Sequence, residues 1–302
     1  MSSEIQNAKS MPESDKGCVS VSKNQGASRV AFWGVILFST SAVLAGSGLF
    51  AGPKGTAAER SGDGPAVIEL FTSQGCYSCP PAEKLLGELI ESHPDVVALE
   101  FHVDYWDSLV YGTHGTHKDP FSDKENTYRQ QLYNMAGLDG RPGVYTPQMV
   151  INGNYATVGS DGRVIRKGID VLDRPFVNLT VSYYSGADSA SGQRGLQVEI
   201  AGGDREIPAS AQVWLAVFDI EKTTKISTGE NHDKTLTSHH IVRDFDQLTS
   251  HTGFADQLSA ANTLEMVHQI KLGEGQGCAV LVQDARLGSI YGAAYCPEEL
   301  YY

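Results

Sequence analysis

The chain has 302 residues, of which 41% are hydrophobic, and its formal net charge at pH 7 is −13. A chain of this length buries a sizeable core and forms one large domain or two modest ones. Its acidic balance argues against nucleic acid and anionic lipid as partners, because both are polyanions that recruit basic surfaces.

The N-terminal segment predicts export. Residues 31–51 carry no charge, and as a helix with about 1.5 Å rise per residue they would span roughly 30 Å, enough for a membrane anchor. The same segment also fits a cleaved signal peptide, since Val43-Leu44-Ala45 resembles a signal-peptidase site. In either case residues 1–30 form a cytoplasmic or leader tail and residues 52–64 form a linker. We therefore expect the remainder to be periplasmic or secreted, and held at the inner membrane if residues 31–51 stay uncleaved.

A C-x-x-C motif, Cys76-Tyr77-Ser78-Cys79, follows a buried-strand pattern at residues 67–71 and precedes a helical pattern at residues 82–92. A thiol at a helix N-terminus meets the positive end of the helix dipole and unpaired N–H groups, so its pKa falls from about 8.5 to roughly 3.5–7.5. The two sulfurs can then cycle between dithiol and disulfide. We expect an exposed Cys76 to be the nucleophile and a more buried Cys79 to resolve the mixed disulfide.

Two other interpretations of this motif remain open. One is a purely structural disulfide, although so short a loop constrains the unfolded chain little. The other is half of a zinc site, although zinc usually takes four ligands and the chain has no second C-x-x-C.

The motif belongs to a predicted α/β domain that spans residues 65–174. Hydrophobic patterns, helix caps and the turn pair Asn152-Gly153, a strong hairpin signal, predict the element order β-α-β, α, β-β-α. After the first strand and helix, the predicted elements are a strand at residues 96–103, a helix at 122–136, hairpin strands at 149–151 and 155–158, and a helix from Ser160 or Asp161 to about Leu172.

From residue 175 onward the pattern changes to short alternating runs separated by Gly, Asp and Ser clusters. Such spacing predicts an all-β, sandwich-like domain over residues 175–302, so the chain is α+β overall. The predicted strands are at residues 177–183, 196–200, 213–218, 239–245, 263–272, 278–283 and 289–295.

Cys278 and Cys296 lie 9 residues to either side of Leu287. An antiparallel hairpin that turns there would place them opposite one another, at disulfide distance. We predict a structural disulfide, the alternative being two reduced, buried thiols. Cys18 lies in the leader, so four cysteines remain for the exported part, as expected in an oxidising compartment.

Tyr145-Thr146-Pro147 stands before the predicted hairpin, and together with the first strand and the C-x-x-C motif it makes the first domain resemble thioredoxin. The resemblance implies that the bond before Pro147 is cis and that this proline faces the cysteines. The stretch between the cysteines and Pro147 is longer than in thioredoxin, and Gln74-Gly75 replaces the usual Trp before the first Cys.

From about residue 65 to the C-terminus, the chain also resembles the exported bacterial family known as domain of unknown function 1223. That family is thioredoxin-like and has no agreed substrate. The motifs that carry the resemblance are ELFTSQGC at 69–76, HVDYWD at 102–107, YTPQMVING at 145–153, and GEN at 229–231 followed by Thr235-Leu236.

Several residues are candidates for the site. Thr146 and Pro147 would offer backbone groups to an extended substrate. Glu69 lies in a strand expected to be buried on both faces, where an ionised carboxylate is costly, so it is a candidate catalytic proton acceptor from Cys79; a hydrogen-bonded Glu without that role is the alternative. Tyr77 is another candidate substrate-binding residue. So are His102, Asp104 and Trp106, for which packing under the inserted helix is the alternative.

These patterns predict an exported thiol–disulfide oxidoreductase that needs no cofactor or metal and acts on thiol- or disulfide-bearing exported proteins or small thiols. The alternative is a metal-handling or ligand-binding module without turnover, in which His114 and His117 would join the cysteines around a metal. A purely structural envelope protein is a third reading. Glu230, Asn231 and His232 are polar residues to which the sequence assigns no mechanism.

Overall fold

The computed structural model describes residues 64–138, 140–184, 194–201, 205–248 and 263–297. The predicted tail, the anchor or signal peptide, and the linker up to residue 63 lie outside these residues. Within the part of the chain that the structure describes, no helix is both long and apolar enough to cross a membrane.

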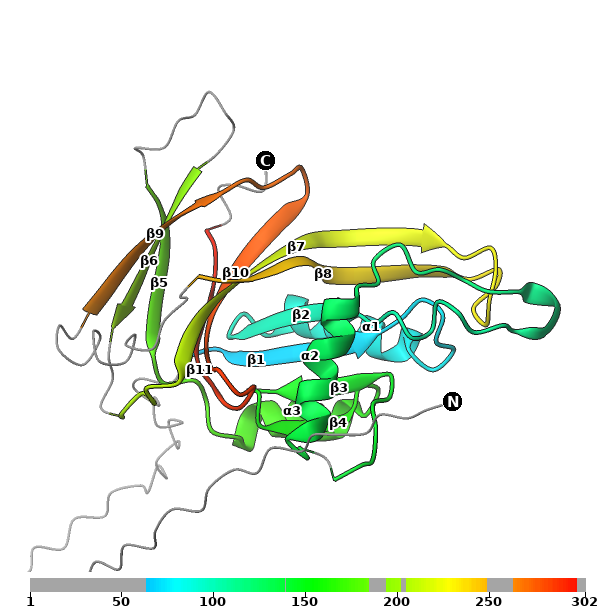
Figure 1. Ribbon diagram of the computed structural model, residues 1–302, viewed down its shortest axis with the longest axis horizontal. Helices are drawn as coiled ribbons and strands as arrows, with labels where there is room; N and C mark the ends of the chain where they lie inside the picture. The colour runs from blue at the N-terminus through cyan, green and yellow to red at the C-terminus, as the bar shows by residue number, and fades with distance from the viewer. Residues whose placement is uncertain (1–63, 139, 185–193, 202–204, 249–262, 298–302) are drawn as a thin grey trace, which may run out of the picture. The chain divides into compact units, whose positions relative to one another are not determined.

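The first half follows the predicted element order (Figure 1). Strand β1 pairs in parallel with β2 and antiparallel with β3, and β3 pairs antiparallel with β4, which gives the order β2-β1-β3-β4. The elements are β1 (Ala66–Thr72), α1 (Pro80–Ser92), β2 (Val96–His102), the short 3₁₀ helix η1 (Gly112–His114), α2 (Lys124–Met135), β3 (Gln148–Ile151), β4 (Tyr155–Val158) and α3 (Gly162–Val171).

Local sequence signals determine where the helices begin and end. Helix α1 starts with Pro80 and Pro81, which suit a first turn because its N–H groups have no partner within the helix. Asp123 caps α2 and Asp161 caps α3, each accepting a backbone N–H of the first turn. Past the end of α2, Gly137 has a φ of +72°, the left-handed conformation that commonly terminates helices.

The β3–β4 hairpin turns at Asn152 and Gly153, as predicted, with φ values of +50° and +69°. Asn152 also ties the turn to its neighbours. Its Oδ1 accepts the N–H of Val67 at 2.8 Å, and its Nδ2 donates to the carbonyl of Asp173 at 2.9 Å. The turn is tightly packed, since a Cβ on Gly153 would collide with the carbonyl oxygen of Gly288.

The second half contributes its described strands to two sheets. Strands β7, β8, β10 and β11 continue the first sheet, in the order β11-β10-β7-β8-β2-β1-β3-β4, whereas β5, β6 and β9 form a separate antiparallel sheet. Strands from both sides of residue 175 therefore share one sheet, joined where β8 runs parallel to β2. The bounds are β5 (Asn178–Tyr184), β6 (Arg194–Ala201), β7 (Ala211–Lys225), β8 (Thr235–Gln247), β9 (Thr263–Ile270), β10 (Gln276–Asp284) and β11 (Ile290–Tyr295).

The two faces of the large sheet are covered differently. On one face, α1 and α3 pack through Leu86 and Ile165 onto the apolar side chains of β1 and β3. On the opposite face, α2 packs through Tyr133 against Phe71 and Phe101. Near β7 and β10, the three-stranded sheet forms a second layer, and its apolar side chains share a cluster with those of the large sheet. The fold is thus a mixed α/β arrangement that is α+β overall, with a sandwich-like part.

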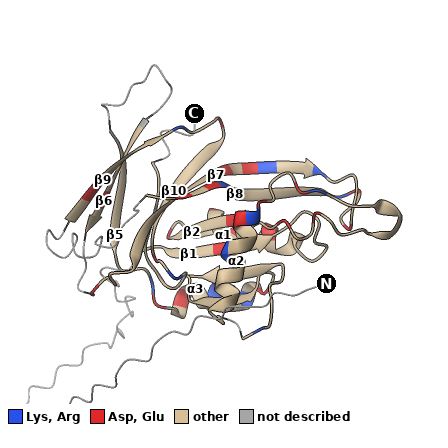
Figure 2. Cartoon of the chain, viewed as in Figure 1, with Lys and Arg blue, Asp and Glu red and all other residues tan. Residues whose placement is uncertain are grey.

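Strands β7 and β8 form a long antiparallel pair whose connecting loop, residues 226–234, lies at the same end as residues 103–123 (Figure 1). The buried first part of β7 gives way to exposed residues from Glu221 onward. Acidic and basic side chains follow one another there, as the red and blue segments toward the arrowhead of β7 show (Figure 2). The last part of β7 is therefore solvated, and it carries residues 226–234 away from the apolar core.

Candidate functional site

The two cysteines of the C-x-x-C motif form a disulfide at the start of α1, with their Cα atoms 5.4 Å apart. Both residues are 0% exposed, so the expectation of an exposed Cys76 was wrong. The exposed residues are those between them, with Tyr77 at 61%. The Oγ of Ser78 lies 3.4 Å from the Sγ of Cys76, so an exposed serine contacts the buried sulfur.

Pro147 lies beside the first turn of α1. The Thr146–Pro147 bond is cis, as the resemblance to thioredoxin implies. A Cβ placed on Gly159 would lie 3.1 Å from the Cβ of Pro147 and 3.2 Å from the Cβ of Ala82. The proline and the turn that follows Cys79 therefore border the same small space.

Trp106 connects this proline segment to the cysteine segment. Its Nε1 donates to the Oγ1 of Thr146 at 2.8 Å, and its Cβ would lie 3.1 Å from a Cβ on Gly75. Its ring stacks on that of Tyr111, with centroids 6.3 Å apart. The structure thus brings the C-x-x-C motif, Thr146, Pro147 and Trp106 to one place.

The loop between β7 and β8, residues 226–234, covers the C-x-x-C motif. The Nδ2 of Asn231 donates to the carbonyls of both Gln74 and Cys76, each at 2.9 Å, across 155 residues of chain in the second case. The side chain of Glu230 accepts the N–H of Tyr77 at 2.8 Å. The sequence assigned no mechanism to these residues of the candidate site. Their only signal was the GEN motif, and its spacing does not reveal which segment it covers.

The same loop contacts the two candidate metal-binding histidines, which belong to residues 103–123. The ring of His114 stacks on that of His232 with centroids 4.4 Å apart, and the N–H of Gly229 donates to the carbonyl of His114 at 2.9 Å. The Nε2 of His117 lies 3.2 Å from the Oε1 of Gln74. Among the described residues, no group of three or more His, Cys, Asp or Glu side chains is arranged to hold a metal ion.

His102 lies beneath the cysteine segment in a fully buried charge network. Its Nδ1 is 2.7 Å from Asp119 and its Nε2 is 2.8 Å from Glu100. Burial alone would lower the pKa of His102, but the two carboxylates outweigh it and raise that pKa well above the ordinary value. Asp119 also accepts the N–H of Gln74 at 2.7 Å, so the network holds the backbone just before Cys76.

Glu83 is a second buried acid that the sequence analysis missed. It follows Cys79 by one helical turn on α1 and is 1% exposed, and its Oε1 accepts the Thr72 hydroxyl at 2.8 Å. Burial, reinforced by the charge of Glu100, raises the pKa of Glu83 to about 8. It also lines a pocket of about 400 Å³ between α1 and β8. The signal for it was its i+4 spacing from Cys79, which places both residues on one helix face.

Glu69 is buried, as expected, but its carboxylate is engaged elsewhere. It pairs with Arg129 at 2.7 Å and accepts the hydroxyl of Tyr133. Both partners belong to α2, on the face of the sheet opposite α1. The structure therefore does not bring Glu69 to the disulfide that opens α1, which argues against its predicted role as proton acceptor from Cys79.

Asp104 organises the backbone rather than facing the cysteines. Its Oδ1 accepts the hydroxyl of Thr127 at 2.6 Å, and its own N–H donates to the Oγ1 of the same threonine at 3.0 Å. The contacts pin the end of β2 to α2. Asp104 therefore positions the segment that carries Trp106.

Cys278 and Cys296 form the second disulfide, with Cα atoms 5.2 Å apart. They flank the paired residues of β10 and β11, and Leu287, at the predicted turn, has a φ of +51°. The four cysteines of the described residues are thus paired as two disulfides, the pattern of a protein that folds in an oxidising, extracytoplasmic compartment.

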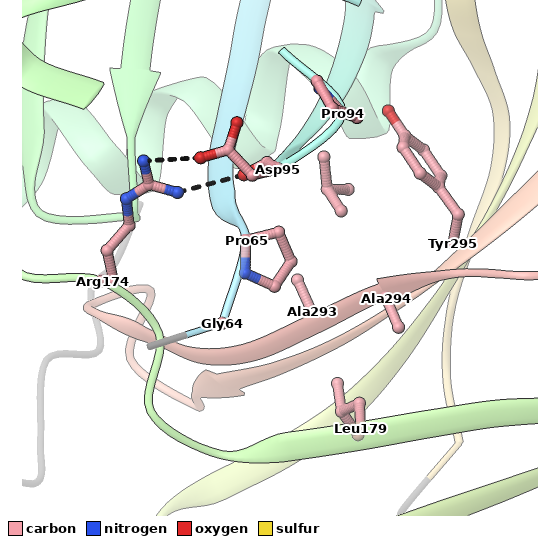
Figure 3. Close-up of a pocket in the computed structure, with 10 residues that line it drawn as sticks. Gly64, Pro65, Pro94, Asp95, Arg174, Leu179, Ala293, Ala294 and Tyr295 are labelled. Atoms are coloured by element: carbon pink, nitrogen blue, oxygen red, sulfur yellow. Dashed lines mark hydrogen bonds and ion pairs between the residues drawn. The ribbon is translucent and has the colours of Figure 1, made fainter. Parts of the chain in front are cut away.

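A separate pocket of about 510 Å³ is bordered by the residues just before β1 and by β2, β5 and β11 (Figure 3). Its two charged groups are paired with one another, since the Nη2 of Arg174 lies 3.0 Å from the carboxylate of Asp95. Apolar side chains such as Pro65 and Ala293 line much of the remainder. None of the predicted site residues lines this pocket, so the C-x-x-C region remains the candidate site.

The fold and the paired cysteines define a disulfide-bonded α+β protein with a C-x-x-C at a helix start. The family model described as "Protein of unknown function (DUF1223)" matches residues 67–283. The chain therefore belongs to this family, as the motifs predicted.

Two solved structures are similar to the chain. Protein AGR_C_4864 from Agrobacterium tumefaciens is 30% identical, with a TM-score of 0.56 over 79% of this chain and 96% of that one. HBP35 of Porphyromonas gingivalis is 15% identical, with a TM-score of 0.51 over 78% of this chain and 75% of that one, and shares the fold alone. The curated proteins include no significant match.

Proposed function

We propose that the protein is an exported, thioredoxin-like thiol–disulfide oxidoreductase whose redox centre is Cys76 and Cys79. One observation carries the proposal: the disulfide opens α1 and lies in the same region as cis-Pro147. The strand order β2-β1-β3-β4, with β1 and β2 parallel, supports the thioredoxin-like assignment. Thr146 and Pro147 form the substrate platform, and Trp106 holds Thr146 in place.

Thiol–disulfide exchange at this site proceeds through two successive attacks. In the reduced protein, the Cys76 thiolate attacks one sulfur of a substrate disulfide, whose S–S bond breaks as a mixed disulfide forms. The Cys79 thiolate then attacks the Cys76 sulfur, and the second substrate thiolate leaves. Two electrons pass from the protein to the substrate, and the protons of Cys76 and Cys79 end on the two substrate thiols. The reverse direction, with a dithiol as reductant, restores the reduced protein.

Glu83, rather than Glu69, is the proton acceptor for Cys79 in this proposal. It lies one turn along the same helix face, it is buried, and its pKa of about 8 is suited to exchanging a proton with a thiol near neutral pH. The pocket that it lines between α1 and β8 offers a route by which the proton can reach solvent.

Trapping of the mixed disulfide tests the proposal. Reduced Cys79→Ser protein, mixed with glutathione disulfide, should accumulate one glutathione adduct at Cys76 per chain, because no resolving thiol is present. Cys76→Ser protein is the matched control and should form the adduct far more slowly. Mass spectrometry measures both, and equal, slow labelling of the two variants would refute the redox assignment.

Elemental analysis of the same samples distinguishes the metal-handling alternative. If the protein is an oxidoreductase, we expect no stoichiometric metal in the purified protein. The double variant His114→Ala/His117→Ala should form the glutathione adduct at an unchanged rate. About one bound ion per chain, lost in that double variant and accompanied by absence of disulfide exchange, would replace the proposal by the metal-handling alternative.

A further inference from the structure

We propose that Asn231 is a positioning residue that holds the β7–β8 loop over the C-x-x-C motif and so reserves the redox centre for low-molecular-weight disulfides, excluding polypeptides. The inference rests on the proposed function, which it deepens by naming the substrate class.

Asn231 anchors the loop through a buried, hydrogen-bonded side chain. The residue is 0% exposed, and its Nδ2 donates both of its hydrogens, one to the carbonyl of Gln74 and one to that of Cys76. Lys234 orients the amide, because its Nζ donates to the Oδ1 of Asn231 at 2.8 Å. Only an amide of this size supplies two donors on one side and an acceptor on the other.

Neighbouring residues of the loop reinforce the closed arrangement. Glu230 accepts the N–H of Tyr77, and the Nζ of Lys234 lies 3.8 Å from the centroid of the Tyr77 ring. Gly229 has a φ of +77°, and a Cβ there would come 2.7 Å from the Cβ of His117. The loop therefore contacts both the cysteine segment and residues 114–117, and its glycine permits the close approach.

The closed loop treats large and small substrates differently. A polypeptide that pairs with Thr146 in an extended form must also lie across the cysteine segment, where Glu230 and Asn231 already occupy the backbone groups of Gln74, Cys76 and Tyr77. A small disulfide needs less room. The exposed Ser78 lies 3.4 Å from the Cys76 sulfur, and an exposed side chain changes rotamer within picoseconds to nanoseconds. In the proposal, a small disulfide therefore reaches the sulfur past this serine without moving the loop.

A selectivity ratio tests the inference. The full chain is reduced, and its reoxidation is timed with glutathione disulfide and, separately, with insulin as a polypeptide disulfide. Wild-type protein should react much faster with glutathione disulfide.

Asn231→Asp keeps the size of the side chain and its acceptor for Lys234, but it turns carboxylate oxygens toward the two carbonyls. Because two hydrogen bonds are lost, the variant should raise the rate with insulin, relative to the rate with glutathione disulfide, by about ten-fold or more. Thr223→Ala, which removes an exposed Thr223–Thr237 contact elsewhere on the same strand pair, is the matched control and should leave the ratio unchanged.

Each outcome decides one question. If wild-type protein reacts with neither disulfide, the proposed function fails. If it reacts with both and Asn231→Asp leaves the ratio unchanged, the role of Asn231 is wrong while the redox function stands. Should the variant fail to fold, reduced wild-type protein is alkylated with iodoacetamide and with a 5-kDa polyethylene glycol maleimide, and comparable labelling of Cys76 by the two reagents would overturn the inference.

Discussion

At the scale of single residues, the neighbours of a buried acid decide how readily it ionises. Glu69 and Glu83 are both buried, yet their surroundings differ. Glu69 has Arg129 as a counter-ion at 2.7 Å, whereas Glu83 accepts a hydrogen bond from a neutral hydroxyl, that of Thr72. A buried carboxyl without an ion-pair partner holds its proton more tightly, and burial reinforced by the charge of Glu100 raises the pKa of Glu83 to about 8, close to that of a thiol.

The raised pKa of Glu83 predicts a pH dependence of stability. Between pH 4.5 and about 8 the folded protein keeps a proton on Glu83 that the unfolded chain releases, so stability is greatest below this window and falls as pH rises through it. Glu83→Gln cannot titrate, so relative to wild type it should gain stability with rising pH, on the order of a few kcal/mol by pH 9.

Urea unfolding from pH 5 to pH 9 measures this difference. Glu91→Gln, at an exposed position on the same helix, is the matched control and should track wild type throughout. A Glu83→Gln curve parallel to the wild-type curve over the whole range would contradict the raised pKa.

At the scale of elements, turns are specified by backbone conformation and by what surrounds them. Gly143 and Gly153 have similar φ values, +77° and +69°. A Cβ on Gly143 would meet nothing within 4 Å, whereas one on Gly153 would collide with the carbonyl of Gly288. The second turn is therefore constrained by tertiary packing in addition to its own conformation.

The two glycines form a matched pair for a stability test. Gly143→Ala should cost about 1–2 kcal/mol, the penalty of the left-handed conformation for a residue with a Cβ. Gly153→Ala should cost about 3 kcal/mol or more, because the β10–β11 connection must also move. Denaturant unfolding compares the two, and equal losses would show that the close contact with Gly288 adds nothing.

At the scale of the whole molecule, one sheet crosses the boundary expected at residue 175. The buried Arg129 of α2 contacts Glu69 of β1 and Gln283 of β10, and Phe101 of β2 packs on Phe245 of β8. Polar and apolar contacts thus link the two halves, and unfolding either half would expose the buried side chains of the other.

This arrangement predicts one cooperative unfolding transition. Trp106 lies in the first half and Trp214 in the second, and the third tryptophan, Trp33, lies outside the described residues. The double variants Trp33→Phe/Trp214→Phe and Trp33→Phe/Trp106→Phe therefore keep one tryptophan each and report the two halves by fluorescence. In each variant, the fluorescence midpoint in urea should equal the midpoint from far-ultraviolet circular dichroism. Two separate midpoints would instead indicate that residues 65–174 and 175–302 unfold as independent domains.

The amino-acid sequence alone predicted the elements, because their signals are local. Caps such as Asp161, the Asn152-Gly153 turn and period-two alternation act within a few residues of chain. The helix start at the C-x-x-C motif and the Cys278–Cys296 pair were predicted for the same reason, since they depend on a short motif and on symmetric spacing within one hairpin. The cis bond before Pro147 was expected from the resemblance to thioredoxin instead.

Only the tertiary structure decided which distant segments meet. Asn231 binds a carbonyl 155 residues away, Glu69 is neutralised by a helix on the far face of its sheet, and β8 pairs with β2 instead of forming a sheet apart. No local pattern encodes such partners, because a polar side chain or an apolar strand is compatible with many neighbours until the whole core has packed. The burial of Cys76, and with it the substrate class that we infer, follows from that long-range packing.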